Sequence, residues 1–262
     1  MDDVVLLERE SAVATITLNR PESMNSMSVA LKEALIAAVA EVSDDPDVRA
    51  VVLTGGPKAF CVGQDLKEHV ALLAADDPAP LNTVEKHFNP LVLALAAMPK
   101  PVVAAVNGMA AGAGASLTFA CDFRIADAKA KFLLAFAGIG LTLDSGASWT
   151  LPRLIGSGRA LAMAMLAEPI NAEQALQMGM ISGITPEGQA LTEAHALATR
   201  LAAGPTHAYA AIKRSLHEAA TLSLADALAL EGELQRDCGQ TEDHRTAVAS
   251  FVAKQKPTFT GH

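Results

Sequence analysis

Two short, uninterrupted apolar runs constrain the fold of this chain more than any other feature. They occupy residues 50–53 and 102–106, and glycines follow each of them. A strand that is apolar without alternation is buried on both faces, as in a parallel sheet covered by helices. Before the first run, residues 13–18 alternate as a strand does, and Ser28 is placed to cap a helix through about Val42. Strand, helix and strand in this order require a crossover connection, so the sequence predicts an α/β fold with a partly parallel sheet.

The rest of the chain separates into a sheet-rich part and a helical part. Further strands are expected at 4–7, 123–125 and 131–134, and a short helix at 112–120. Periodic, alanine-rich segments predict helices at 157–167, 172–178, 189–203, 206–219 and 223–238. We therefore expect a sheet-containing core over residues 1–200 and a helical C-terminal region over residues 201–262.

Charge and cysteine content exclude several classes of function. The chain carries 20 Lys and Arg against 29 Asp and Glu, a net charge of −9. Nucleic acids and anionic membranes need a basic surface, so neither is expected as a partner, although a local cluster of cations could still hold a small anionic ligand. No stretch reaches the roughly 20 apolar residues of a membrane span. The acidic start Met1-Asp2-Asp3 and three cysteines without a CxxC pair predict a reduced, cytoplasmic protein, and no metal site is expected.

Two glycine-containing loops follow the predicted buried strands. They span residues 59–66 and 107–115, and each leads into a helix. Two such turns on neighbouring strands can direct two backbone N–H groups at one oxygen, as an oxyanion hole requires. Glycines after strands also serve turn geometry and close packing, so either loop alone has this simpler interpretation.

The order and spacing of several motifs carry a family resemblance. The motifs are LNRP at 18–21, NS at 25–26, AFCVGQDL at 59–66, KPVVAAVNG at 100–108, ACDF at 120–123, LPRLIG at 151–156 and AEQA at 172–175. Over nearly its whole length the chain resembles the crotonase, or enoyl-CoA hydratase/isomerase, superfamily. The resemblance implies a spiral of β-β-α units with C-terminal trimerisation helices, assembled as homotrimers or dimers of trimers. It also implies an acyl-CoA thioester substrate, with coenzyme A as part of that substrate and no separate cofactor.

The resemblance assigns site residues by position. The two N–H donors to the thioester carbonyl fall on Gln64 and Ala113, and the carbonyl of Val62, next to Gly63, falls where relatives meet adenine. Asn25 and Ser26, in the NS motif, and Phe136 and Trp149, further along, are expected at the substrate. Lys254 and Lys256 fall where a trimer reaches a neighbour's CoA phosphates, although they also fit a solvated basic helix end.

Two positions depart from the hydratase pattern. Hydratases that resemble this chain carry two glutamates, and here Ser116 and Phe136 replace them. Addition of water needs a base and an acid, which neither side chain provides. Asp144 is the remaining candidate base: its apolar neighbours would raise its pKa, and a following helix would lower it. Asp144 also fits a plain N-cap that accepts from the Ala147 N–H.

Within the superfamily, one branch shares more of these residues than the others. It comprises the ring-1,2-epoxyphenylacetyl-CoA isomerases of phenylacetate degradation, which share GQDL at 63–66, FNPLV at 88–92, AAGAGA at 110–115, AF at 135–136, Asp144, Trp149 and FTG at 259–261. The leading hypothesis is an isomerase in which Asp144 transfers a proton while Gln64 and Ala113 stabilise an enolate. Three alternatives stay open: an enoyl-CoA hydratase in name with weak or no hydratase activity, an aryl-CoA dehalogenase that uses Asp144 as nucleophile with Phe136 and His87, and a non-catalytic acyl-CoA-binding scaffold.

Overall fold

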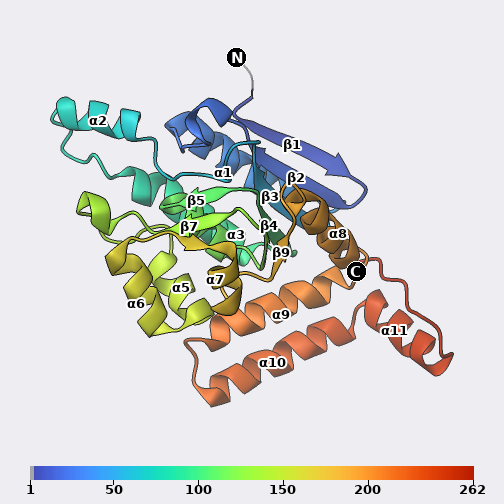
Figure 1. Ribbon diagram of the computed structural model, residues 1–262. Coiled ribbons are helices and arrows are strands. Elements are labelled where there is room, and N and C mark those ends of the chain that lie inside the picture. Colours follow the sequence, from blue (N-terminus) through green and yellow to red (C-terminus); the bar gives the residue numbers. More distant parts are fainter. Residues whose placement is uncertain (1–2) are drawn as a thin grey trace.

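A six-stranded sheet forms the centre of the computed structural model, which describes residues 3–262 (Figure 1). Met1 and Asp2 of the acidic start lie outside the described residues. The strand order is β1-β2-β3-β4-β6-β9. The strands are β1 (Val5–Glu10), β2 (Val13–Leu18), β3 (Ala50–Gly55), β4 (Val102–Val106), β6 (Phe123–Asp127) and β9 (Gly183–Thr185). The β1–β2 pair is antiparallel and every other pair is parallel. The mixed α/β fold expected from the sequence is confirmed.

Helices cover both faces of the two central strands, which explains their uninterrupted apolar sequences. Every residue of β3 and β4 is buried. Val52 and Val103, which pair in register, face helix α8 (Ala190–Ala202), whose alanines allow close approach. Leu53 and Ala104 belong to the larger core on the opposite face, with helices α1 (Val29–Asp44) and α3 (Asn89–Ala97).

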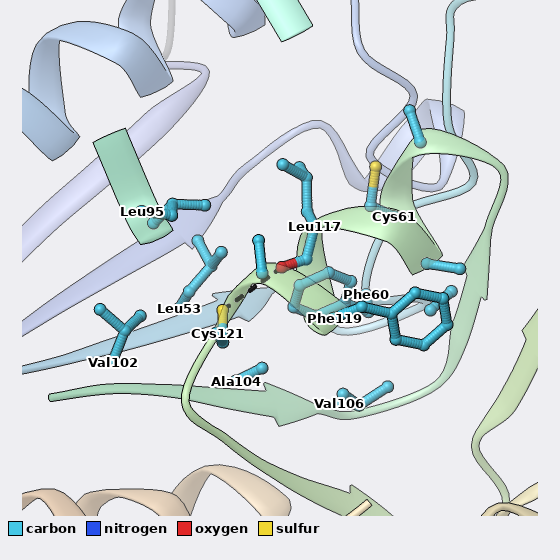
Figure 2. Close-up of a cluster of buried hydrophobic side chains, with 14 of the residues drawn as sticks. Leu53, Phe60, Cys61, Leu95, Val102, Ala104, Val106, Leu117, Phe119 and Cys121 are labelled. Atoms are coloured by element: carbon cyan, nitrogen blue, oxygen red, sulfur yellow. Dashed lines mark hydrogen bonds between the residues drawn. The ribbon is translucent and has the colours of Figure 1, made fainter. Parts of the chain in front are cut away.

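Figure 2 shows part of this larger core, in which β4 packs against α3 and α4 (Ala113–Ala120). Val102, Ala104 and Val106 of β4 belong to one core with Leu95 of α3 and Leu117 of α4. The Cys121 thiol donates to the Leu117 carbonyl at 3.4 Å, so the helix end is satisfied inside the core. This packing fixes α4 and the loop that precedes it.

A second, three-stranded sheet lies beside the first, with the order β5-β7-β8. Its strands are β5 (Met109–Ala111), β7 (Lys131–Leu133) and β8 (Ile170–Asn171). The sequence predicts a loop at residues 109–111 and no strand at β8 or β9, so these three strands are corrections to that prediction. These three strands have two or three residues each, too few for an alternating pattern to distinguish them from loops.

The last three helices extend away from the sheets (Figure 1). They are α9 (Thr206–Ala219), α10 (Leu224–Gly239) and α11 (Glu242–Val252). Exposed large apolar side chains on them include Ile212, Leu216, Leu224, Leu228 and Phe251. The buried carboxylate of Asp243 accepts from the N–H groups of Thr260 and Gly261 at 2.7 and 2.9 Å, which ties the C-terminus back to α11.

Four further α-helices and a π-helical turn belong to the fold. They are α2 (Leu66–Ala74), α5 (Ala147–Ile155), α6 (Ser157–Leu166), α7 (Ala172–Gln177) and a π-helical turn over Val84–Phe88 that leads into α3. Across residues 3–262, no helix is both long enough and apolar enough to span a bilayer.

The segments that follow β3 and β4 approach each other closely. Cys61 and Ala110 form a parallel bridge, in which the Ala111 N–H donates to the Cys61 carbonyl at 2.8 Å. Gly114, the second residue of α4, faces the same carbonyl, and a Cβ atom at Gly114 would overlap with it. The two predicted loops are therefore neighbours, and a glycine at position 114 allows their contact.

We expect Gly114→Ala to destabilise the protein, because the added methyl group overlaps with backbone that cannot move independently. The matched control is Gly158→Ala, since Gly158 is also the second residue of a helix (α6) but has open space around it. Overpacking should lower the free energy of unfolding by about 1–3 kcal/mol in Gly114→Ala. The control should be neutral or stabilising by up to about 1 kcal/mol. Urea denaturation measures both, and equal stabilities would contradict the packing described here.

Candidate active site

A cavity of about 510 Å³ lies where the two loops meet. Both loops line it, the first through Val62, Gly63 and Gln64 and the second through Gly112 and Ala113. Phe136 and Asp144 line it from the segments after β7. The structure therefore brings together, in one cavity, candidate residues from three separate stretches of the sequence.

The backbone N–H of Gln64 has no acceptor among the described residues. Gln64 forms a parallel bridge with Met27. The hydrogen bonds of this bridge come from the residues on either side of Gln64 and not from Gln64 itself. The Met27 N–H donates to the Gly63 carbonyl at 2.7 Å, and the Asp65 N–H donates to the Met27 carbonyl at 3.2 Å. Because backbone groups alternate along an extended chain, the N–H of Gln64 is directed away from Met27.

The N–H of Ala113 is also without an acceptor in residues 3–262. Ala113 is the first residue of α4, so its N–H belongs to the donors that a helix start leaves unpaired. Gly112 precedes it with a φ of +52°, a conformation that favours glycine. A Cβ atom at Gly63 would lie 3.3 Å from the nitrogen of Ala113, so the two loops are in contact here. Two N–H groups on adjacent backbones can donate to a single oxygen atom.

Asp144 contributes a partly buried carboxyl group to the cavity. It lies before α5, near Phe136, Ile139 and Leu141, which line the same cavity. Burial raises the pKa of Asp144, and a hydrogen bond from the Ser145 hydroxyl to Oδ1 at 2.8 Å opposes this effect. A carboxyl group with a raised pKa is a stronger base when it is ionised, which suits proton transfer from carbon.

The N-cap interpretation of Asp144 is wrong. The N-cap residue of α5 is Gly146, and no side chain caps this helix. The Ala147 N–H donates to the backbone carbonyl of Asp144 at 3.1 Å and not to its carboxylate. The carboxyl group is therefore available to the cavity.

The two positions where hydratases carry glutamate provide no acid or base. Ser116 is fully buried in α4, and its hydroxyl donates to the Gly112 carbonyl at 3.1 Å. Phe136 lines the cavity with a hydrocarbon ring. The other carboxylates that line the cavity within the described chain are Glu22, which is exposed, and Asp65.

Asp65 secures the first loop. Its carboxylate accepts from Arg20 at 2.9 Å, from Ser26 at 3.2 Å and from the Lys67 N–H at 3.0 Å, which caps α2. Burial favours the neutral form, but these hydrogen bonds outweigh it and lower the pKa of Asp65. Asp65 is therefore held ionised, and its carboxylate oxygens are already engaged in hydrogen bonds.

Of the other residues predicted at the substrate, Ser26 lines the cavity, whereas Asn25, Trp149, Lys254 and Lys256 do not. Asn25 is fully buried beneath the cavity and donates to the Ala59 and Phe60 carbonyls at 2.8 and 3.2 Å. Trp149 is not among the lining residues: it stacks under Arg153 and meets the edge of His217. Lys254 and Lys256 follow α11, which lies on the opposite side of the molecule from α2 (Figure 1), and neither lysine lines the cavity.

Several side chains that draw attention in the sequence have structural roles. Burial raises the pKa of Cys61 to about 12, which leaves its thiol protonated and unreactive. His87 does not line the cavity, and its Nδ1 lies 3.0 Å from the Thr83 hydroxyl. Within the described part of the chain, no three His, Cys, Asp or Glu side chains are grouped so that they could hold a metal ion.

Two further residues at the site are not among those predicted from the sequence. His69 on α2 lines the cavity, although its spacing from other histidines gives no signal. Lys32 is fully buried behind the cavity, and its ammonium group donates to Oε1 of Gln64 at 3.0 Å. A lysine within the apolar face of the helix at 29–44 is the signal that would have indicated it.

Comparison with known proteins gives a consistent family. Residues 8–262 match the family model described as enoyl-CoA hydratase/isomerase. The chain is 41% identical over 261 residues to the 1,2-epoxyphenylacetyl-CoA isomerase of Escherichia coli (strain K12), with 100% of both chains covered. It is 43% identical over 255 residues to a Rhodobacter capsulatus protein whose name assigns it to the enoyl-CoA hydratases, with 97% of this chain and 96% of the relative covered.

A solved structure agrees with this comparison. The crystal structure of a Mycobacterium abscessus protein described as an enoyl-CoA hydratase/isomerase matches with a TM-score of 0.95 and 43% identity, covering 98% of this chain and 100% of the other. The family match covers most of the chain, and the sequence identity to these relatives extends over nearly all of it. The chain therefore belongs to the enoyl-CoA hydratase/isomerase family, the crotonase superfamily.

Proposed function

We propose that this protein is an acyl-CoA isomerase that shifts a double bond, or rearranges a ring epoxide, by proton transfer. One observation carries the proposal: a partly buried carboxyl group of raised pKa shares a cavity with two adjacent backbones whose N–H groups are unpaired in the described chain. A base together with two donors for one oxygen is what deprotonation next to a thioester carbonyl requires.

In this mechanism the N–H groups of Gln64 and Ala113 bind the thioester carbonyl oxygen. Asp144 removes a proton from the α-carbon of a 3-enoyl thioester, and the electron pair forms an enolate whose negative oxygen the two N–H groups stabilise. The protonated Asp144 then returns the proton to the γ-carbon, so the double bond moves into conjugation and no atom is gained or lost. Loss of one such donor costs about 10²–10³ in kcat in other enzymes.

The cavity favours isomerisation over hydration. Water addition needs a group to activate water and a group to protonate carbon, and Ser116 and Phe136 occupy the places of the hydratase glutamates. The name of the Escherichia coli relative supports a ring-epoxide substrate, whereas the Rhodobacter capsulatus relative carries a hydratase name. Assays with both substrate types therefore decide the specific reaction.

Substrate binding and assembly complete the proposal. Coenzyme A enters as part of the substrate, with the Val62 carbonyl near the adenine, and no separate cofactor takes part. In a homotrimer, or a dimer of trimers, the apolar side chains exposed on α9–α11 become buried between subunits. Because neither Lys254 nor Lys256 lines the cavity of its own chain, they would serve a neighbour's CoA phosphates.

We expect Asp144→Asn to abolish isomerisation while substrate binding persists. The amide has almost the same shape but cannot take a proton, so kcat for a 3-enoyl-CoA should fall by about 100-fold or more. Stopped assays of conjugated product measure kcat, and calorimetric titration with butyryl-CoA checks binding. The exposed Asp47 lies outside the cavity, and Asp47→Asn is the control with unchanged kcat. Full activity in Asp144→Asn would remove Asp144 as the base.

We expect Ser145→Ala to move the acidic limb of the kcat/KM profile to higher pH. The Ser145 hydroxyl stabilises the ionised form of Asp144, so removing it raises the pKa of Asp144 further. The base acts only when it is ionised. A higher pKa of Asp144 therefore moves the onset of activity to a higher pH. Ser148→Ala, at an exposed position of α5, is the control. A limb that stays in place or moves to lower pH would contradict this role.

A further inference from the structure

Lys32 is a charged side chain without any exposed surface, located directly behind the candidate oxyanion hole. It lies in the first turn of α1 and is 0% exposed. Its ammonium group donates to Oε1 of Gln64 at 3.0 Å and to Oγ1 of Thr83 at 2.5 Å, and it lies 5.2 Å from the centre of the Phe88 ring. All three partners line the cavity, whereas Lys32 does not.

A buried ammonium group is costly, so its retention needs compensation. Burial lowers the pKa of Lys32, and the carboxylates of Glu68, Asp65 and Glu33 oppose this effect. The neighbouring His87 adds no charge of its own at neutral pH, because burial and the charge of Lys32 lower its pKa. The surrounding carboxylates and the two oxygen atoms that the amino group contacts therefore favour its charged form against the effect of burial.

The contact between Lys32 and the Gln64 side chain adds a third constraint on the peptide that carries the Gln64 N–H. Hydrogen bonds at Gly63 and Asp65 hold the backbone on either side of Gln64 against Met27. Neither of these hydrogen bonds involves the Gln64 side chain. That side chain instead accepts a hydrogen bond from Lys32, which lies on α1. The peptide that carries the Gln64 N–H is thus fixed at both neighbours and through its own side chain.

We propose that Lys32 is a positioning residue of the oxyanion hole, which acts through the Gln64 side chain to hold the Gln64 N–H toward the thioester carbonyl. The proposal deepens the isomerase function above and rests on it. Preorganised donors are effective because they need no reorganisation during the reaction, so looser placement should weaken polarisation of the carbonyl more than binding of the whole substrate.

Lys32→Met tests this proposal, since methionine is unbranched like lysine and removes both the charge and the donors. We expect kcat to fall by about 10-fold, which is less than the roughly 10²–10³-fold that complete loss of an oxyanion donor costs, and KM to change less than about 3-fold. Gln64→Leu removes the same contact and keeps the backbone N–H, so it should reproduce the defect. The double variant should be no worse than either single variant, because all three lose one interaction.

The direct measurement is the carbonyl stretch of bound butyryl-CoA labelled with ¹³C at the thioester carbon, by isotope-edited infrared spectroscopy. Butyryl-CoA has no double bond to move, so the spectrum reports polarisation without turnover. The wild-type protein should shift this band to lower frequency, and Lys32→Met and Gln64→Leu should shift it less. If Lys32→Met does not fold, Gln64→Leu alone carries the test.

Lys100→Met is the matched control. Lys100 is also buried, burial also lowers its pKa, and it donates to the Val42 and Asp45 carbonyls at 2.8 Å without lining the cavity. This variant should lose stability but keep kcat and the carbonyl shift. A shift in Lys32→Met and Gln64→Leu equal to that of the wild type would overturn the role of Lys32 alone. Absence of any shift in the wild type would overturn the oxyanion hole itself, and the role of Lys32 with it.

Discussion

The rest of the site depends on the contact between the chain segments that follow β3 and β4. Cys61 pairs with Ala110, and Gly114 allows α4 to begin against the Cys61 carbonyl. This contact places Gly63 against Ala113 and leaves two N–H groups unpaired on adjacent backbones within the described chain. Unpaired backbone donors at a protected position are costly unless a ligand uses them, so the arrangement is suited to binding an oxygen atom that becomes negative.

The two aspartates at the cavity differ in pKa because their surroundings differ. Asp65 is held ionised by Arg20 and helix α2, whereas the pKa of Asp144 is raised by its apolar neighbours and only one hydroxyl group opposes this. One aspartate therefore serves the loop and the other is free to exchange a proton. Lys32 adds a buried amino group that donates to Gln64 on the side of the first loop. A single exchanging carboxylate is sufficient for a proton shift between two carbons, but hydration needs a second group.

Local sequence patterns predicted the central strands and the two loops, which depend on neighbouring residues, but not the contacts between residues that are distant in the sequence. The uninterrupted runs indicated β3 and β4 because both faces are covered, and the glycines indicated the two loops. Trp149 was misplaced because its partner His217 is distant in the sequence, and the pairing depends on how α9 packs against α5. Lys32 occupies the apolar face of α1 with Leu35 and Val39, a signal of burial, but its contact with Gln64 follows only from the tertiary fold.

The proposed reaction is proton-transfer isomerisation at Asp144 without water addition. The most direct test is incubation of the purified protein with a 3-enoyl-CoA and, separately, with crotonyl-CoA, followed by absorbance and mass. We predict that the 3-enoyl-CoA gains the absorbance of a conjugated thioester at constant mass, while crotonyl-CoA stays unchanged. Conversion of crotonyl-CoA to a product heavier by one water molecule would contradict this mechanism, which supplies one exchanging carboxylate and no second group to activate water.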